Sequence, residues 1–271
     1  MDDMRIAAVT VCAPLGALED NLARTDRWTA EAARGGARLV CFPELHLTGY
    51  AACPDLLRYA QPVPGPATRE LQAIARRHGM VLLAGLAEAA PSGRVYAAHL
   101  VVPPEGPLGL YRKLHTAPPE QGLMHPGEAV PLFRAEGLVF GIQLCYDAHF
   151  PELSTRMALD GAEAIFFPHA SPRGTPEEKR QSWSRHLPAR AFDNGLFVVA
   201  CNQVGDNGGG LDFPGAAVCY GPDGQLRASR AGGEEGLLLV DLRAAELARV
   251  REHRMRYFLP NRRPEIYRTG D

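Results

Sequence analysis

Residues 139–153 read VFGIQLCYDAHFPEL, and this stretch changes character at its centre. The apolar first half has the composition of a buried strand, which ends at Cys145. The polar residues after it lead into Pro151-Glu152, and proline is favoured in the first turn of a helix. The stretch therefore predicts a strand, a turn that carries a cysteine, and a helix.

Segments on both sides continue this alternation of strands and helices. Apolar runs predict strands at 4–11, 37–44, 81–89, 163–168 and 195–203. Helical spacing of apolar residues predicts helices at 17–36, 67–80, 151–162 and 175–194, the last interrupted near Pro188. Residues 93–144 hold only strand-like runs, at 94–102, 109–114, 131–137 and 138–145, which predicts antiparallel hairpins. Two further strand-like runs lie at 215–224 and 235–242.

This order of elements predicts a mixed sheet system with helices on its outer faces. Neither an internal repeat nor a linker divides the chain, and the glycine-rich stretch 205–210 has the composition of a surface loop. We therefore expect residues 1–271 to form one domain.

The composition is that of an ordinary globular protein, with 46% hydrophobic and 22% charged residues. A net charge of −2 gives no basic surplus for nucleic acid or for an anionic membrane, so a small molecule is the expected partner. No apolar run approaches the roughly 20 residues that span a bilayer. The acidic start Met1-Asp2-Asp3 lacks the features of a signal peptide, so we predict a cytoplasmic protein.

The six cysteines are scattered and include no Cys-x-x-Cys pair, which predicts free thiols that are mostly buried. Motifs for dinucleotides, for nucleoside triphosphates, for zinc and for a serine nucleophile are all missing, and the histidines show no metal-ligand spacing. We therefore expect neither a cofactor nor a metal. A metal-dependent phosphoesterase, which also builds layered sandwiches, would need clustered Asp, His and Asn at strand ends, and this set is not visible.

Three apolar runs end in a reactive side chain, namely Glu44, Lys113 and Cys145. A thiol, a carboxylate and an ammonium suit acyl transfer, because the carboxylate takes the thiol proton and the ammonium stabilises the oxyanion. Each residue also has a purely structural interpretation, such as a packed thiol or a solvated strand-end charge. Cys201 ends a strand-like run just as Cys145 does, and spacing alone does not rank the two.

The sequence resembles the nitrilase, or carbon–nitrogen hydrolase, superfamily at several motifs that occur in the expected order. Residues 185–205 and 261–268 are similar to the family as well, so the resemblance covers nearly the whole chain. The motifs are Pro43-Glu44 with Gly49-Tyr50, Tyr111-Arg112-Lys113-Leu114 with Pro118-Pro119-Glu120 and Pro126-Gly127, and Cys145-Tyr146-Asp147 with Phe150-Pro151-Glu152-Leu153.

The resemblance implies an α+β fold, a four-layer α-β-β-α sandwich that assembles into homodimers or larger homo-oligomers. It also implies that Glu44 is the general base, Lys113 the oxyanion stabiliser and Cys145 the nucleophile. Glu120 would lie beside them and position the substrate or the base. The C-terminal tail, from about residue 250 to 271, is expected to pack on the domain or on a partner subunit.

Cys-Tyr-Asp after the strand points to the amidase-like branch, because nitrilases usually have Cys-Trp-Glu there. We therefore predict a thiol hydrolase that cleaves a small linear amide through a thioester and releases ammonia or an amine, with a carbamoyl-amine or an ω-amide acid as the alternative substrate. The ω-amidase pattern has an arginine where this chain has His149, and histidine pairs less well with a carboxylate. A catalytically silent binding protein on the same scaffold is the alternative from another class. Residues that we expect to shape the pocket are Tyr50, Tyr146, His149, His169 and Arg173.

Overall fold

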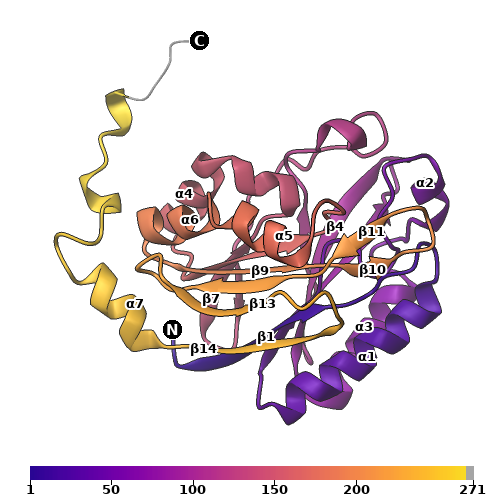
Figure 1. Cartoon of the computed structure of the whole chain (residues 1–271), viewed down its shortest axis with the longest axis horizontal. Coiled ribbons are helices and arrows are strands. Elements are labelled where there is room, and N and C mark those ends of the chain that lie inside the picture. Colours follow the sequence, from indigo (N-terminus) through magenta and orange to yellow (C-terminus); the bar gives the residue numbers. More distant parts are fainter. Residues whose placement is uncertain (267–271) are drawn as a thin grey trace.

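The computed structural model describes residues 1–266, in which two six-stranded sheets stack between outer layers of helices (Figure 1). Figure 1 shows α1 and α3 on one side of the strands and α4 and α6 on the other. The order of layers is therefore α-β-β-α, and the predicted sandwich is confirmed.

The first sheet has the strand order β14-β1-β2-β3-β4-β5, with β1, β2 and β3 parallel and the remaining pairs antiparallel. Helices α1 and α3 precede β2 and β3 and pack on this sheet. Its strands are β1 (Met4–Thr10), β2 (Leu39–Cys41), β3 (Val81–Ala89), β4 (Val95–Val102), β5 (Gly109–Arg112) and β14 (Gly236–Leu242). The helices in this part are α1 (Leu18–Arg34), α2 (Asp55–Tyr59) and α3 (Pro66–His78).

The second sheet has the order β13-β12-β9-β8-β7-β6, with β7, β8 and β9 parallel. Its strands are β6 (Phe133–Ala135), β7 (Leu138–Ile142), β8 (Ala164–His169), β9 (Phe197–Asn202), β12 (Ala217–Tyr220) and β13 (Leu226–Arg230). The helices are α4 (Pro151–Leu159), α5 (Pro176–Trp183), α6 (Leu187–Asn194) and α7 (Ala244–Arg251). The remaining elements are the hairpin of β10 (Val204–Asp206) and β11 (Asp212–Pro214) and the 3₁₀ turns η1 (Pro118–Glu120), η2 (Cys145–His149), η3 (Leu259–Asn261) and η4 (Pro264–Ile266).

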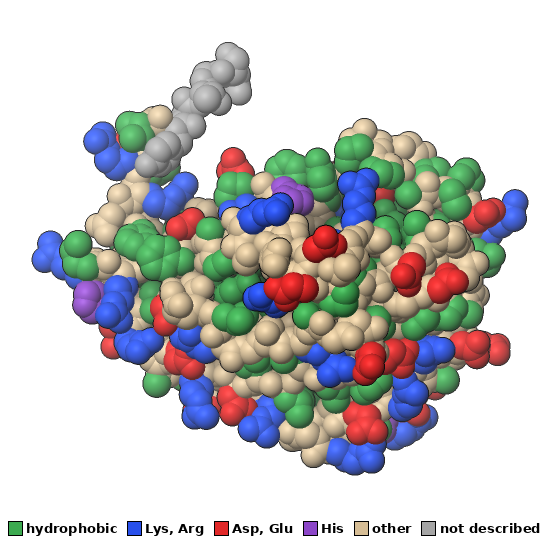
Figure 2. Space-filling model, in the orientation of Figure 1, with side chains coloured by type: hydrophobic (Ala, Val, Ile, Leu, Met, Phe, Trp, Pro, Cys, Tyr) green, Lys and Arg blue, Asp and Glu red, His purple; other side chains and the backbone are tan. Residues whose placement is uncertain are grey.

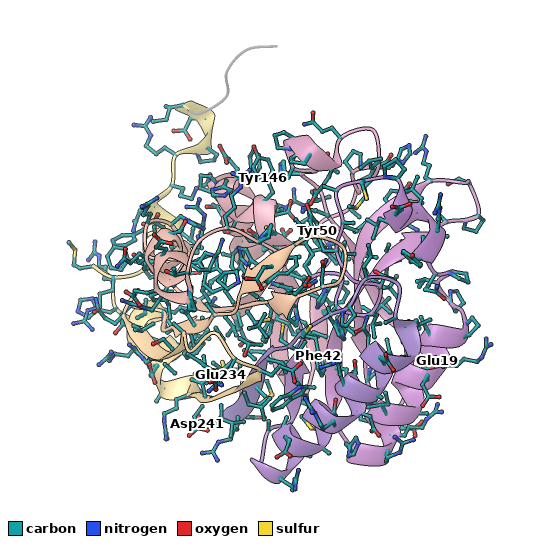
Figure 3. The ribbon with its side chains drawn as sticks, turned by 45° about the vertical axis from the view of Figure 1, so that its right-hand side comes forward. Glu19, Phe42, Tyr50, Tyr146, Glu234 and Asp241 are labelled. Atoms are coloured by element: carbon teal, nitrogen blue, oxygen red, sulfur yellow. The ribbon has the colours of Figure 1, made fainter. Side chains whose placement is uncertain are left out.

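Alternating side chains of β1 show why the layers form. Ile6 and Ala8 belong to the buried cluster shared with the second sheet, whereas Ala7 and Val9 pack with residues of the helix layer. Since both faces of the sheet are covered, its central strands read as continuous apolar runs. In the side-chain view of Figure 3, Phe42 lies inside this structure and the exposed Glu19 lies on α1.

Most elements agree with the sequence predictions. The helix predicted at 175–194 is broken between Trp183 and Leu187, just before Pro188, as expected. The hairpins of residues 93–144 are antiparallel as predicted, but β5 and β6 lie in different sheets. The prediction that Cys145 ends a strand was wrong, because β7 ends at Ile142 and Cys145 opens the turn η2. Short elements with little apolar periodicity, such as α2, α7 and β13, were missed.

The chain from residue 250 to 266 was predicted to pack on the domain or on a partner. Val250 and Leu259 are buried, whereas Met255 and Ile266 are exposed. Residues 267–271 of this tail lie outside the described part of the chain, so its packing on a partner stays a prediction. We propose that residues 1–271 form one domain, since the two sheets share one buried cluster.

Acidic and basic side chains are interspersed over the face seen in Figure 2, in keeping with the small net charge. Within residues 1–266, no helix combines the length and apolar character needed to cross a membrane.

Candidate active site

The three candidate residues follow strands of both sheets. Glu44 lies three residues beyond β2, Lys113 directly follows β5, and Cys145 lies three residues beyond β7. Open sheets with parallel strands place their sites beyond the carboxyl ends of those strands. The sandwich thus brings residues from two sheets to one place.

The buried centre of the site is a lysine between two carboxylates. Nζ of Lys113 donates hydrogen bonds to Oε1 of Glu44 and to Oε1 of Glu120, each over 2.8 Å. All three side chains are at most 2% exposed. Burial lowers the pKa of Lys113, but the adjacent charge of Glu44 and then that of Glu120 outweigh it, and the net pKa lies well above the ordinary value. Lys113 is therefore a charged ammonium at neutral pH.

Glu44 is held by both sheets. Its Oε2 accepts a hydrogen bond of 3.0 Å from the backbone N–H of Ala170, which follows β8, and its backbone oxygen accepts one of 2.8 Å from Nε2 of Gln203. Burial raises the pKa of Glu44, and although the charge of Lys113 opposes it, the pKa reaches about 7. A carboxyl group with that pKa both accepts and donates protons near neutral pH.

Glu120 completes the network from the side opposite Glu44. Besides the bond from Lys113, its Oε1 accepts one of 3.1 Å from the hydroxyl of Tyr50. Its Oε2 accepts one of 2.8 Å from the backbone N–H of Ala117. Both carboxylate oxygens of Glu120 are therefore satisfied, and this fixes Lys113 in position.

Cys145 adopts a strained backbone conformation at the start of η2. Its φ of 43° lies in the left-handed region, which non-glycine residues rarely occupy, and Leu45 beside Glu44 has a φ of 53°. Asp147 holds this turn, because its Oδ2 accepts bonds from the backbone N–H of Leu144 over 2.9 Å and from the hydroxyl of Tyr111 over 2.7 Å. Sequence reasoning had not singled out Asp147 as a support for the cysteine.

The thiol of Cys145 is neutral at rest. Burial raises its pKa to about 12, and the charge of Glu44 adds to this effect while that of Lys113 opposes it. Cys201, by contrast, is fully buried between the sheets, with its sulfur 4.0 Å from that of Cys41. The structure thus separates two cysteines that the sequence left equal, since Cys145 lines a cavity and Cys201 does not. All six cysteines are free thiols, as predicted.

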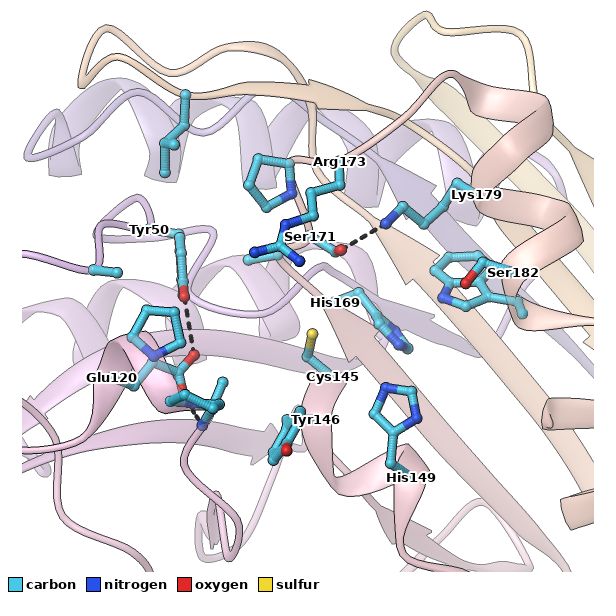
Figure 4. Close-up of a pocket in the computed structure, with 18 of the residues that line it drawn as sticks. Tyr50, Glu120, Cys145, Tyr146, His149, His169, Ser171, Arg173, Lys179 and Ser182 are labelled. Carbon is cyan, nitrogen blue, oxygen red and sulfur yellow. Dashed lines mark hydrogen bonds between the residues drawn. The ribbon is translucent and has the colours of Figure 1, made fainter. Parts of the chain in front are cut away.

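Cys145 and Glu120 both line a cavity of about 690 Å³ (Figure 4). Figure 4 shows the sulfur of Cys145 pointing into this space. Every predicted pocket residue also lines it, namely Tyr50, Tyr146, His149, His169 and Arg173. Glu44 and Lys113 are fully buried behind it. Sequence reasoning missed further lining residues, including Ser171, Lys179, Trp183 and His186.

One wall of the cavity carries neutral imidazoles. The ring of His169 packs on that of Trp183, with 4.7 Å between centroids, and the rings of His149 and His186 lie 5.0 Å apart. Burial lowers the pKa of all three histidines, that of His186 to about 4. Within the described chain, no group of three or more His, Cys, Asp or Glu residues is arranged to hold a metal ion.

This chain is similar over most of its length to a family of known enzymes. A carbon-nitrogen hydrolase family model matches residues 5–252. The chain is 31% identical over 248 residues to an (R)-stereoselective amidase of a Pseudomonas species, and the match covers 92% of this chain and 88% of that protein. It is 32% identical over 258 residues to a nitrilase of Pyrococcus abyssi, and the match covers 92% of this chain and 93% of that protein.

A solved amidase of Nesterenkonia sp. AN1, from the nitrilase superfamily, has a TM-score of 0.83 to this structure at 28% sequence identity. The match covers 97% of this chain and 95% of that one. One mutant of that amidase has been solved in complex with butyramide, and another carries the acetamide moiety of fluoroacetamide covalently at the active-site cysteine.

Proposed function

Because this chain belongs to the carbon–nitrogen hydrolase family, within its amidase-like branch, we propose that it hydrolyses a small linear amide through a thioester on Cys145. The observation that supports this most directly is the buried ammonium of Lys113, clamped between Glu44 and Glu120 behind the cavity that Cys145 lines. In this proposal Cys145 is the nucleophile, Glu44 is the general base, Lys113 stabilises the oxyanion, and Glu120 positions Lys113.

The first half of the reaction forms the thioester. The proton of the Cys145 thiol passes to Glu44 while the sulfur bonds to the amide carbon, and the carbonyl electron pair moves onto the oxygen. Burial raises the pKa of the Cys145 thiol far above its ordinary value, which disfavours a free thiolate, so proton transfer to Glu44 accompanies attack. Lys113 and the backbone N–H of Tyr146 stabilise the oxyanion.

Collapse of this intermediate breaks the C–N bond. The oxyanion electrons re-form the carbonyl, and the proton held by Glu44 goes to the departing nitrogen, which leaves as ammonia or an amine. Water then gives a proton to Glu44 as its oxygen bonds to the thioester carbon. The C–S bond breaks, the sulfur regains its proton from Glu44, and the carboxylic acid leaves.

A carbamoyl-amine would pass through the same steps and release carbon dioxide as well, so ammonia assays on amides, carbamoyl-amines and nitriles rank the substrate classes. We also propose that the protein works in the cytoplasm as a homodimer or larger homo-oligomer. Exposed apolar side chains of Phe192, Met255 and Phe258 support the assembly, and light scattering after size exclusion measures it.

The test compares Cys145→Ala with Cys201→Ala, a matched loss of one thiol outside the cavity. Ammonia release from butyramide should vanish in the first variant and persist in the second, with both retaining the native circular dichroism spectrum. After mixing with fluoroacetamide, a mass spectrum of the denatured wild-type protein should show one adduct, which peptide mapping locates at Cys145. Ammonia release by Cys145→Ala would falsify the assignment, and a protein that forms no adduct with any amide would be a binding protein instead.

A further inference from the structure

Lysine is almost absent from this chain, and both copies lie at the same site. Of the 29 cationic side chains other than histidine, only Lys113 and Lys179 are lysines, and all the others are arginines. Lysine differs from arginine in presenting a compact point charge on a flexible stem. Lys113 belongs to the network described above, and Lys179, on α5, lines the cavity of Cys145.

Lys179 is a buried cation without a counter-charge. It is 7% exposed, and its Nζ donates a hydrogen bond of 2.6 Å to Oγ of Ser171. Across residues 1–266, no carboxylate lies within ion-pairing distance of it, whereas Lys113 has two such partners. Burial of an uncompensated charge is costly, and burial lowers the pKa of Lys179 accordingly, with the charge of Arg173 adding to the effect. Lys179 therefore has a hydrogen-bond partner but no neighbouring negative charge among the described residues.

Arg173 brings a second cation to the same part of the cavity. It lies on the segment between β8 and α5, and within the described residues it forms no ion pair with a carboxylate. Figure 4 shows Arg173 and Lys179 on either side of Ser171, on the side of the cavity toward which the sulfur of Cys145 points. The ammonium of Lys179 uses one of its three donors on Ser171, which leaves two for a ligand.

The other charged groups of the site are already matched. Glu44 and Glu120 share Lys113, and the imidazoles of the cavity offer no positive charge because burial lowers the pKa of His149 and His169. Three cations therefore face two carboxylates around this cavity. The surplus positive charge lies at Arg173 and Lys179.

We infer that Arg173, Lys179 and Ser171 form a subsite for a carboxylate, so that the preferred substrates are amide acids with an amide at one end and a carboxylate at the other. This inference rests on the proposed function, since it assumes that the amide end reaches Cys145. The carboxylate would accept hydrogen bonds from the ammonium and the guanidinium, and charge-assisted bonds of this kind are the strong ones in proteins. Lys179, Arg173 and Cys145 line one cavity of about 690 Å³, which indicates a small substrate with a short chain between its two ends.

The test uses pairs of substrates that differ only in charge. Succinamate and glutaramate each have a neutral isostere, 4-oxopentanamide and 5-oxohexanamide, in which a methyl group replaces one carboxylate oxygen. The measured quantity is the ratio of kcat/KM for the acid to kcat/KM for its isostere. In the wild type this ratio should be at least about tenfold for one pair, and Lys179→Met and Arg173→Met should each reduce it about tenfold, mainly through KM.

Arg180→Met is the matched control, because Arg180 is the next residue on α5, pairs with Glu177 and does not line the cavity. Its ratio should equal that of the wild type. Succinate should also inhibit hydrolysis of 4-oxopentanamide competitively, with a Ki that rises at least about tenfold in Lys179→Met. Arg173 is exposed, so Arg173→Met keeps the test decisive even if Lys179→Met misfolds.

A wild-type ratio near one would overturn the inference. An equal loss of kcat/KM for the acid and its isostere in Lys179→Met would overturn it as well, and would indicate that Lys179 acts on the thiol of Cys145 instead. Hydrolysis of butyramide without hydrolysis of either acid would overturn the carboxylate subsite alone. Failure to hydrolyse any of these amides, together with no adduct from fluoroacetamide, would instead remove the proposed function itself.

Discussion

Replacement of Glu120 by glutamine should move the pH dependence of the reaction, and the size of the change follows from the geometry. Oε1 of Glu44 and Oε1 of Glu120 each lie 2.8 Å from Nζ of Lys113, so 2.8 Å plus 2.8 Å places them at most 5.6 Å apart. At an effective dielectric constant of about 20, two unit charges at this separation repel by about 3 kcal/mol, which corresponds to about 2 in pKa. The charge of Glu120 is one of the causes that raise the pKa of Glu44, after burial.

The assay is ammonia release from butyramide, measured as kcat/KM between about pH 5 and pH 9. In the proposed mechanism Glu44 must be ionised to accept the thiol proton, so kcat/KM should rise with pH through about 7 in the wild type. In Glu120→Gln the midpoint should fall by about 1 to 2 pH units. Glutamine has one acceptor oxygen where glutamate has two, so one buried donor loses its partner, and the free energy of unfolding should fall by about 1–3 kcal/mol.

Tyr50→Phe is the matched control, since it removes the hydroxyl bound to Glu120 without changing the charge of the network. Its midpoint should stay near that of the wild type. A folded and active Glu120→Gln enzyme with an unchanged midpoint would refute the reasoning, because the titrating group would then not be Glu44 in contact with this network. A midpoint moved to higher pH would refute it as well.

Three other substitutions test the framework of the site. Lys113→Met should lower kcat at least about 100-fold through loss of the oxyanion partner. Glu44 would then have a pKa raised further above its unfolded value, so the stability of this variant should be greater near pH 5 than near pH 8 in thermal melts. Asp147→Asn should lower the free energy of unfolding in urea by about 2–4 kcal/mol, because a buried acceptor of several bonds is weakened. Gly85→Ala would place a Cβ 2.5 Å from the backbone nitrogen of Leu45, so it should lower the free energy of unfolding by about 1–3 kcal/mol and lower kcat. Neither effect should occur if the loop after β2 has room for the methyl group.

Local patterns in the sequence were sufficient for most of the fold. The strand predicted at 81–89 is β3 with the same bounds, and the helix predicted at 67–80 is α3 to within two residues at each end. Apolar periodicity, glycine stops and helix-opening prolines act over a few residues, so a single sequence displays them. The motifs around Glu44, Lys113 and Cys145 indicated the family, and the resemblance to that family predicted the α-β-β-α sandwich.

Only the tertiary structure shows which hydrogen bonds join these side chains and how burial shifts the pKa of each one. Lys113 meets Glu44 across 69 residues of sequence and Ala170 meets Glu44 across 126, and no local pattern encodes such contacts. The pKa of a carboxyl or thiol group depends on burial and on charges brought near by folding, so a pKa of about 7 for Glu44 could not be foreseen from its neighbours in the chain. The role of Lys179 could not be predicted from the sequence either, because only the folded chain shows its buried ammonium in the cavity that Cys145 lines, with no carboxylate to pair with it in the described residues.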